Sequence, residues 1–159
     1  MGRAGRTGFV VATLAALLAA APAALAAGTG APPSRAEFVD EADSICEVPY
    51  RKGLRLLGNA DERADAGDYV PAGKKVVRAG RTFLGVNERL SNLVTPTADT
   101  RLIEAWLKGV REGSRLVVKA GKAYKRKRPK GAERLLDRSH RTTRRANKKV
   151  AALGFNFCA

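Results

Sequence analysis

Two cysteines constrain the fold of this 159-residue chain more than any other feature of its sequence. Cys46 lies in the first third of the chain, and Cys158 is the second-to-last residue. A bond between them would join an early segment to the end of the chain and close most of the chain into one loop. The pair has no CxxC spacing, and a single histidine leaves little to complete a zinc site. In an oxidising compartment we therefore expect a structural disulfide, Cys46–Cys158, rather than a metal site or a catalytic thiol.

The first 26 residues have the pattern of a secretory signal peptide. Arg3 and Arg6 form a positive start, an uncharged apolar run follows over 9–21, and Ala24-Leu25-Ala26 supplies the small residues of a cleavage site. The alternative is an uncleaved membrane anchor, for which roughly 20 apolar residues are needed. Residues 27–33 are small residues, Gly and Pro, which predict a flexible linker. We expect a secreted or extracytoplasmic protein, with association with the cell envelope as one option.

Residues 34–159 are predicted to form a single helical domain. The capping box of Ser34 and Glu37 marks the start of the first helix, which Pro49 is expected to kink or break. Apolar residues recur at helical spacing in four segments, with no alternating strand pattern. The expected helices cover about 35–64, 70–94, 97–126 and 131–153. The fold class is therefore all-α: an antiparallel up-down four-helix bundle closed by the Cys46–Cys158 disulfide.

In this topology the fourth helix should lie beside the first, and the cysteines should be within reach of each other. Cys46 lies about 11 residues into the first helix, or roughly 16 Å from its start. The five residues from Gly154 to Cys158 can cover that distance at up to about 3.3 Å each if they turn back along the bundle. Gly109, Gly113 and Gly121 lower the helicity of the third helix, and close approach of a neighbouring helix is the expected reason.

Positive charge is concentrated in the last third of the chain. Of 30 basic and 15 acidic residues, fourteen basic and two acidic ones lie between 119 and 149. Residues of one loop, and others spaced four, three, four and three along one helix face, form what we call the cationic surface. It comprises Lys125, Arg126, Lys127, Arg128, Arg134, Arg138, Arg141, Arg145 and Lys148. Anionic lipid head groups or phosphate-bearing wall polymers are the expected partners. Sequence-specific binding of nucleic acid is not expected, because no aromatic residues are interleaved with the basic ones.

A solvated surface, partly neutralised by acidic residues of the first helix, is the alternative interpretation. The first helix carries Glu37, Asp40, Glu41, Asp43 and Glu47. Three of these could share a face for a cation, but no calcium-loop pattern accompanies them, so charge pairing with the fourth helix is the expected role. His140 has no recognisable triad, and Trp106 and Tyr124 are expected to be core residues. We predict no catalytic residue, no metal site and no cofactor.

The two ends of the predicted domain resemble those of a diffuse set of small exported helical proteins from actinobacteria. The resemblance rests on Phe38-Val39-x-x-Ala42-Asp43-x-Ile45-Cys46 and on Leu153-Gly154-Phe155-x-x-Cys158. It implies a disulfide-closed helical bundle and no particular activity. Together these features predict a secreted, non-catalytic envelope or interaction protein with a cationic surface. The alternative is a small-ligand carrier or sensor module that uses the interior of the bundle.

Overall fold

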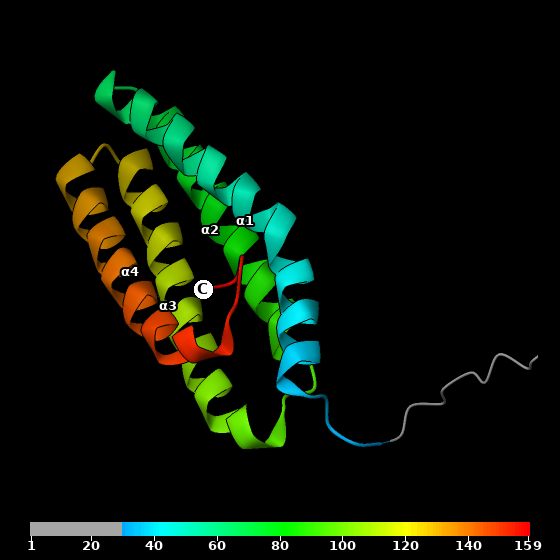
Figure 1. Ribbon diagram of the computed structural model, residues 1–159. Coiled ribbons are helices and arrows are strands. Elements are labelled where there is room, and N and C mark those ends of the chain that lie inside the picture. Colours follow the sequence, from blue (N-terminus) through cyan, green and yellow to red (C-terminus); the bar gives the residue numbers. More distant parts are fainter. Residues whose placement is uncertain (1–29) are drawn as a thin grey trace, which may run out of the picture. The chain divides into compact units, whose positions relative to one another are not determined.

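Four α-helices account for most of the part of the chain that the structure, a computed structural model, describes: residues 30–159 (Figure 1). The predicted signal peptide and residues 27–29 of the predicted linker lie outside this part, and residues 30–33 contain no helix. The α-helices are α1 (Arg35–Asp65), α2 (Tyr69–Ser91), α3 (Thr100–Lys125) and α4 (Pro129–Val150). Two short 3-10 helices, η1 (Thr97–Asp99) and η2 (Ala151–Leu153), precede α3 and follow α4. No strand occurs in residues 30–159, so the all-α prediction is confirmed.

The start of α1 follows from its first residues. The Ser34 hydroxyl accepts a hydrogen bond from the amide of Glu37 at 3.3 Å, and the Ser34 amide donates to the Glu37 carboxylate at 2.7 Å. These bonds lower the pKa of Glu37 below its ordinary value. The predicted capping box is therefore confirmed, and it satisfies two amide donors that the first turn of a helix otherwise leaves unpaired.

Pro49 does not break α1, which continues through it as one helix of 31 residues. Figure 1 shows the axis of α1 changing direction near its middle. A bend is expected there because proline lacks an amide donor and its ring crowds the preceding turn. Of the two predicted outcomes, the structure shows a bent but continuous helix and not a break.

The helices pack in chain order: α1 against α2, α2 against α3, and α3 against α4. The helices α1 and α4 make no comparable direct contact, so the expectation that the fourth helix packs beside the first is wrong. The C-terminal tail, residues 154–159, crosses from α4 toward α1 instead (Figure 1). Tail side chains thus pack between α1 and α4, where the two helices do not contact each other directly.

Glycines allow the central helices to approach closely. A Cβ atom on Gly73 of α2 would lie 2.5 Å from the carbonyl oxygen of Gly121 on α3, and one on Gly121 would lie 2.6 Å from the amide nitrogen of Val77. On the other side of α3, Gly109 faces Ala146 and Gly113 faces Thr143, both on α4. The predicted packing role of the α3 glycines is confirmed. Backbone approach at these positions sets the spacing of three of the four helices.

Two apolar clusters form the core. The cluster near the tail centres on Trp106, which is 0 % exposed, and includes Phe38, Ile45, Leu90, Ile103, Val150 and Leu153. The second lies toward the α1–α2 and α3–α4 turns and includes Ala60, Ala72, Val76, Val117, Ala120, Tyr124 and Ala132. Trp106 and Tyr124 are both buried, as predicted. The second cluster is made largely of small residues, which suits the close contact between α2 and α3.

Candidate functional site

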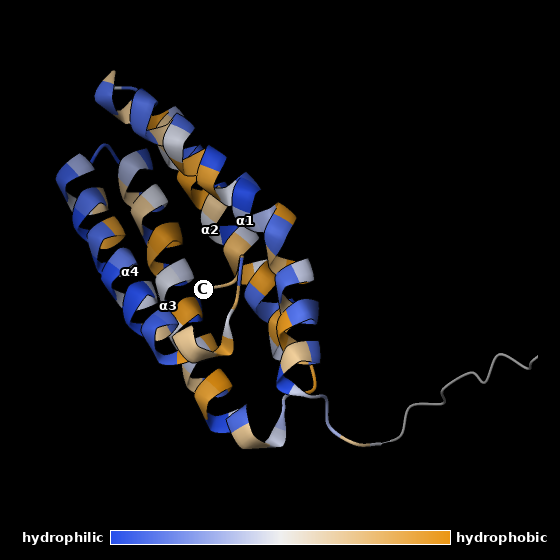
Figure 2. Cartoon of the chain, viewed as in Figure 1, coloured by the Kyte–Doolittle hydropathy of each residue, from blue (hydrophilic) through white to orange (hydrophobic). Residues whose placement is uncertain are grey.

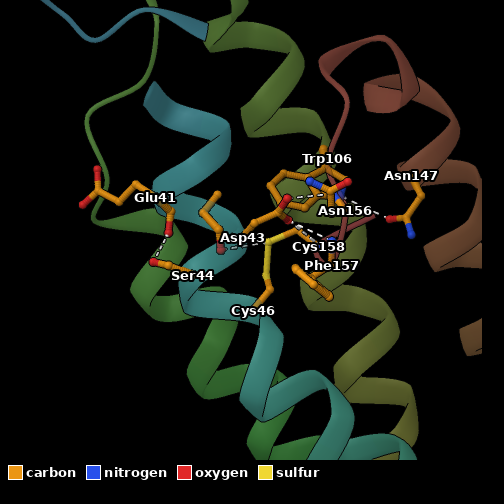
Figure 3. Close-up of a disulfide and its surroundings, with 10 residues drawn as sticks. Glu41, Asp43, Ser44, Cys46, Trp106, Asn147, Asn156, Phe157 and Cys158 are labelled. Carbon is orange, nitrogen blue, oxygen red and sulfur yellow. Dashed lines mark hydrogen bonds between the residues drawn. A yellow bond between two sulfur atoms is a disulfide. The ribbon is translucent and has the colours of Figure 1, made fainter. Parts of the chain in front are cut away.

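The tail is tied to α1 by the predicted disulfide. Cys46 and Cys158 are bonded, with 5.4 Å between their Cα atoms (Figure 3). Cys46 is buried and belongs to the tail-side core cluster. Gly154, at φ 84°, takes the left-handed conformation that ends η2 and turns the chain back along the bundle. The five-residue return predicted from the sequence is therefore confirmed.

Asp43 holds the same tail through hydrogen bonds. Its carboxylate accepts from the backbone amides of Asn156 at 2.7 Å, Phe157 at 2.9 Å and Cys158 at 3.1 Å (Figure 3). Asp43 is 7 % exposed, and these amides belong to a tail segment without helix or strand. The carboxylate thus satisfies amides that no regular structure pairs, in charge-assisted bonds. The expectation that Asp43 pairs with the basic fourth helix is wrong.

Aromatic residues of the tail complete the core. Phe155 stacks on Trp106 with 4.9 Å between ring centroids, and it meets the edge of Phe38 at 6.2 Å. The Trp106 ring nitrogen donates to the Oδ1 atom of Asn147 at 3.2 Å, which joins α3 to α4 (Figure 3). A buried tryptophan normally finds such a partner. Asn147 could not be identified from the sequence, because no local pattern shows which polar side chain on another helix will face a buried indole.

The cationic surface is exposed along its whole extent. All nine of its residues, at the end of α3, in the α3–α4 turn and on α4, have exposed side chains. Figure 2 shows α4 predominantly hydrophilic along the face in view. Among residues 30–159, one of the nine has a carboxylate partner: Arg138 lies 3.7 Å from Glu112 of α3, and both side chains are more than half exposed. An exposed pair of this kind contributes little.

The acidic residues of α1 do not neutralise this surface. No ion pair in the described part of the chain joins α1 to α4, so the predicted pairing between the two helices is wrong. Glu47 pairs with Arg51 at 3.0 Å within α1. The elements packed against α1 are α2 and the tail rather than α4.

One residue of the cationic surface has a left-handed backbone. Lys127 has φ 54°, and its amide donates to the Tyr124 carbonyl at 2.8 Å while the Arg128 amide donates to the Ala123 carbonyl at 3.1 Å. The α1–α2 turn makes the same pair of bonds around a glycine, Gly67, at φ 80°. Glycine is the usual residue at this position of a helix end. Lysine at this φ costs about 1 kcal/mol or more relative to a right-handed conformation.

A groove of about 360 Å³ separates α1 from α4. Helices α2 and α3 form its floor, α1 and α4 form its walls, and tail residues 157–159 close one end. Leu54 on the α1 wall is 48 % exposed, and Tyr50 is 43 % exposed. The bundle interior considered for a small ligand is therefore an open groove rather than a closed pocket around Trp106. Leu54 and Leu57 line the groove because α4 does not pack against α1.

A second recess, of about 520 Å³, adjoins the groove beside the tail. The two share Tyr50, His140, Thr143, Asn147 and Ala159, and the recess adds Arg144 and Lys148 from α4. His140 is exposed at this junction. The neighbouring Ser139 is buried and donates its hydroxyl to the Gly113 carbonyl at 2.8 Å, so it serves the α3–α4 contact.

Two further carboxyl groups in the described residues have shifted pKa values, Asp99 and Asp61. Arg35 donates two hydrogen bonds to Asp99, at 2.9 and 2.8 Å, and fastens the start of α1 to η1. This guanidinium holds the pKa of Asp99 below its ordinary value. Burial, and to a lesser extent Asp65, raises the pKa of Asp61 at the far end of the groove. No group of His, Cys, Asp and Glu suited to a metal ion occurs in residues 30–159.

Comparison of the chain with protein-family models, with curated proteins and with solved structures finds no match. The resemblance to exported actinobacterial proteins therefore stays a prediction. Within residues 30–159, no helix is long and apolar enough to cross a membrane.

Proposed function

We propose that this protein is an exported, non-catalytic envelope protein that binds phosphate-bearing anionic partners through its cationic surface. The supporting observation is that all nine residues of this surface are exposed, while eight have no carboxylate partner among the described residues. Coverage by α1 was the main alternative, and α1 does not pack there. The positive charge is therefore presented to solvent.

The distribution of charge supports a surface that attracts anions rather than one that only keeps the protein in solution. Fourteen basic and two acidic residues lie within 119–149, so the field is concentrated on the α4 side of the bundle. Such a concentration raises the local density of anions and speeds their association. Each Lys or Arg side chain close to an anionic lipid surface contributes about 1 kcal/mol to binding.

The backbone conformation of Lys127 also supports a binding role for the cationic surface. The equivalent position of the α1–α2 turn carries glycine, which adopts a positive φ without strain. A lysine there places a cation at the tip of the surface and lowers stability. We therefore expect Lys127→Gly to stabilise the fold by about 1 kcal/mol and to weaken binding to anionic vesicles, as measured by urea denaturation and co-sedimentation. A gain in stability with unchanged vesicle binding would remove Lys127 from the proposed site.

Charge reversal tests the proposal directly. We expect Arg141→Glu/Arg145→Glu to weaken binding to phosphatidylglycerol-containing vesicles by more than tenfold, because each cation contributes about 1 kcal/mol. The matched control is Arg78→Glu/Arg81→Glu, which changes net charge equally at two exposed positions of α2. Equal losses in the two variants, or binding that ignores salt, would contradict a site on the cationic surface.

Two probes separate the sources of phosphate. Vesicles with and without phosphatidylglycerol test a lipid surface, and soluble polyglycerol phosphate tests a wall-type polymer. Binding of both with the same dependence on Arg141 and Arg145 supports recognition of phosphate itself. Binding of neither at low salt would refute the proposed function.

A further inference from the structure

The groove between α1 and α4 has an apolar lining and one cationic end. Apolar side chains from all four helices line it, among them Leu54, Leu57, Phe83, Val86, Val110 and Leu136. At the tail end it continues into the recess lined by Arg144 and Lys148. At the other end lies a carboxyl group, Asp61. The groove is therefore polarised, with cations at one end and an acid at the other.

Its dimensions suit a single hydrocarbon chain. On α4 the lining extends from Leu136 to Asn147, or about 16 Å at 1.5 Å per residue. This is close to half of the roughly 30 Å hydrocarbon thickness of a bilayer, which is the length that one acyl chain covers in one leaflet. The volume of about 360 Å³ lies at the small end of the range for small-molecule sites.

Larger occupants fit less well. A helix is about 10 Å across, so most of one laid along the groove would remain outside it. A second copy of the chain would need to cover about 800 Å² for a stable interface. Of the large apolar side chains in the described residues, four are exposed, and only Tyr50 and Leu54 of these line the groove. The exposed apolar area is therefore narrow.

We infer that the groove binds the acyl chain of one fatty acid, with its carboxylate at the Arg144 and Lys148 end. Neither cation has a carboxylate partner among the described residues. Tyr50 lines the same junction, where its hydroxyl can also donate to an acid. The chain then lies along Leu54, Leu57, Phe83 and Val86 and points toward the α1–α2 turn. Asp61 at that end disfavours the reverse orientation.

Calorimetric titration of monomeric fatty acids into the full folded domain tests this inference. Octanoate, decanoate, laurate, myristate and palmitate, each below its micellar concentration, should bind one per chain. Affinity should rise about fourfold per added methylene while the groove fills, and stop rising once the acyl chain exceeds the groove. Absence of saturable laurate binding, or a rise in affinity that continues without limit, would overturn the inference.

Substitutions at each part of the groove have matched controls. Leu54→Glu should abolish laurate binding, whereas Val48→Glu, at a position on α1 that is 71 % exposed and lines neither recess, should not. Arg144→Glu/Lys148→Glu should weaken laurate about tenfold and leave dodecyltrimethylammonium no weaker. Arg78→Glu/Arg81→Glu makes the same charge change at exposed positions of α2 that line neither the groove nor the recess, and it should have little effect. Equal effects within either pair would refute the assignment.

Self-association is the competing outcome. Sedimentation should show the same monomeric mass for the wild type and Leu54→Glu, and a dimer that Leu54→Glu dissociates would assign the groove to a second copy. The cationic end of the groove shares Lys148 with the cationic surface, but the two proposals are tested separately, because the fatty acid assay contains no phosphate. Vesicle binding without laurate binding overturns the groove alone, and the reverse overturns the cationic surface alone.

Discussion

Replacing Cys46 and Cys158 by serine removes the covalent link between α1 and the tail, and its effect can be calculated from the loop that the disulfide closes. The cysteines are 112 residues apart. In the chain-entropy model a loop of this length stabilises the folded state by about 4.8 kcal/mol at 25 °C. The tail keeps its three hydrogen bonds to Asp43 and the stack of Phe155 on Trp106, so we expect the variant to fold with the tail docked.

A loss of this size is large beside the total stability of a typical domain, about 5–15 kcal/mol. It corresponds to a decrease in melting temperature of roughly 15–25 °C for a domain of this length. Urea denaturation followed by fluorescence is a suitable assay, because the single tryptophan is fully buried. Wild-type protein in reductant is the matched control: it keeps both sulfur atoms and loses only the bond.

A decrease in the free energy of unfolding below about 2 kcal/mol, in both the serine variant and the reduced wild type, would contradict stabilisation by loop closure. Native protein with two titratable thiols would refute the disulfide itself. A large loss in the serine variant alone would mean that packing of the Cys46 side chain, rather than loop closure, carries the effect.

The other predictions concern three separate contacts. Asp43→Ala leaves three tail amides without their acceptor and should lower the free energy of unfolding by about 3 kcal/mol, whereas Asp40→Ala, exposed on the same helix, should change it little in urea denaturation. Because the folded-state pKa of Asp99 is depressed, its contribution is fully present above the unfolded carboxyl pKa and is lost as pH falls below about 4. The stability difference between wild type and Asp99→Asn should therefore shrink between pH 6 and pH 2.5, and a constant difference would contradict this. Gly121→Ala should destabilise by about 1–3 kcal/mol, because its Cβ would meet the α2 backbone. Gly85→Ala, with open space around it, should instead stabilise by up to about 1 kcal/mol, and similar effects at both glycines would rule out the close crossing.

Much of the helical organisation could be predicted because its causes are local. The Ser34 capping box, the apolar period of each helix and the glycine after η2 involve residues a few positions apart. The disulfide was predictable for a different reason: with two cysteines in the chain only one intramolecular pairing exists. The concentration of positive charge in residues 119–149 was also predictable, because it is a property of the sequence itself, whereas its coverage by α1 was left open.

What the tertiary structure decided is which helix faces are neighbours. From the sequence, the acidic first helix and the basic fourth helix were natural partners, and Asp43 was grouped with the other acids. The folded chain instead places aromatic tail residues against Trp106 and gives the Asp43 carboxylate to the tail amides. The Asp43 contacts join residues more than a hundred positions apart, and Phe155 contacts a tryptophan on another helix. No local periodicity specifies either contact.

The groove is the clearest product of that tertiary choice. Leu54, Leu57 and Leu136 lie within predicted helices. An amphipathic pattern does not show whether an apolar helix face packs against another helix or lines an open groove. Close approach at Gly73 and Gly121 draws α2 and α3 together, and the tail occupies only one end of the gap between α1 and α4. Four helices, one disulfide and a concentrated positive charge can be predicted from the sequence without the tertiary structure. Packing alone determined that the charge is uncovered and that an apolar groove lies beside it, because both depend on contacts between residues distant in the chain.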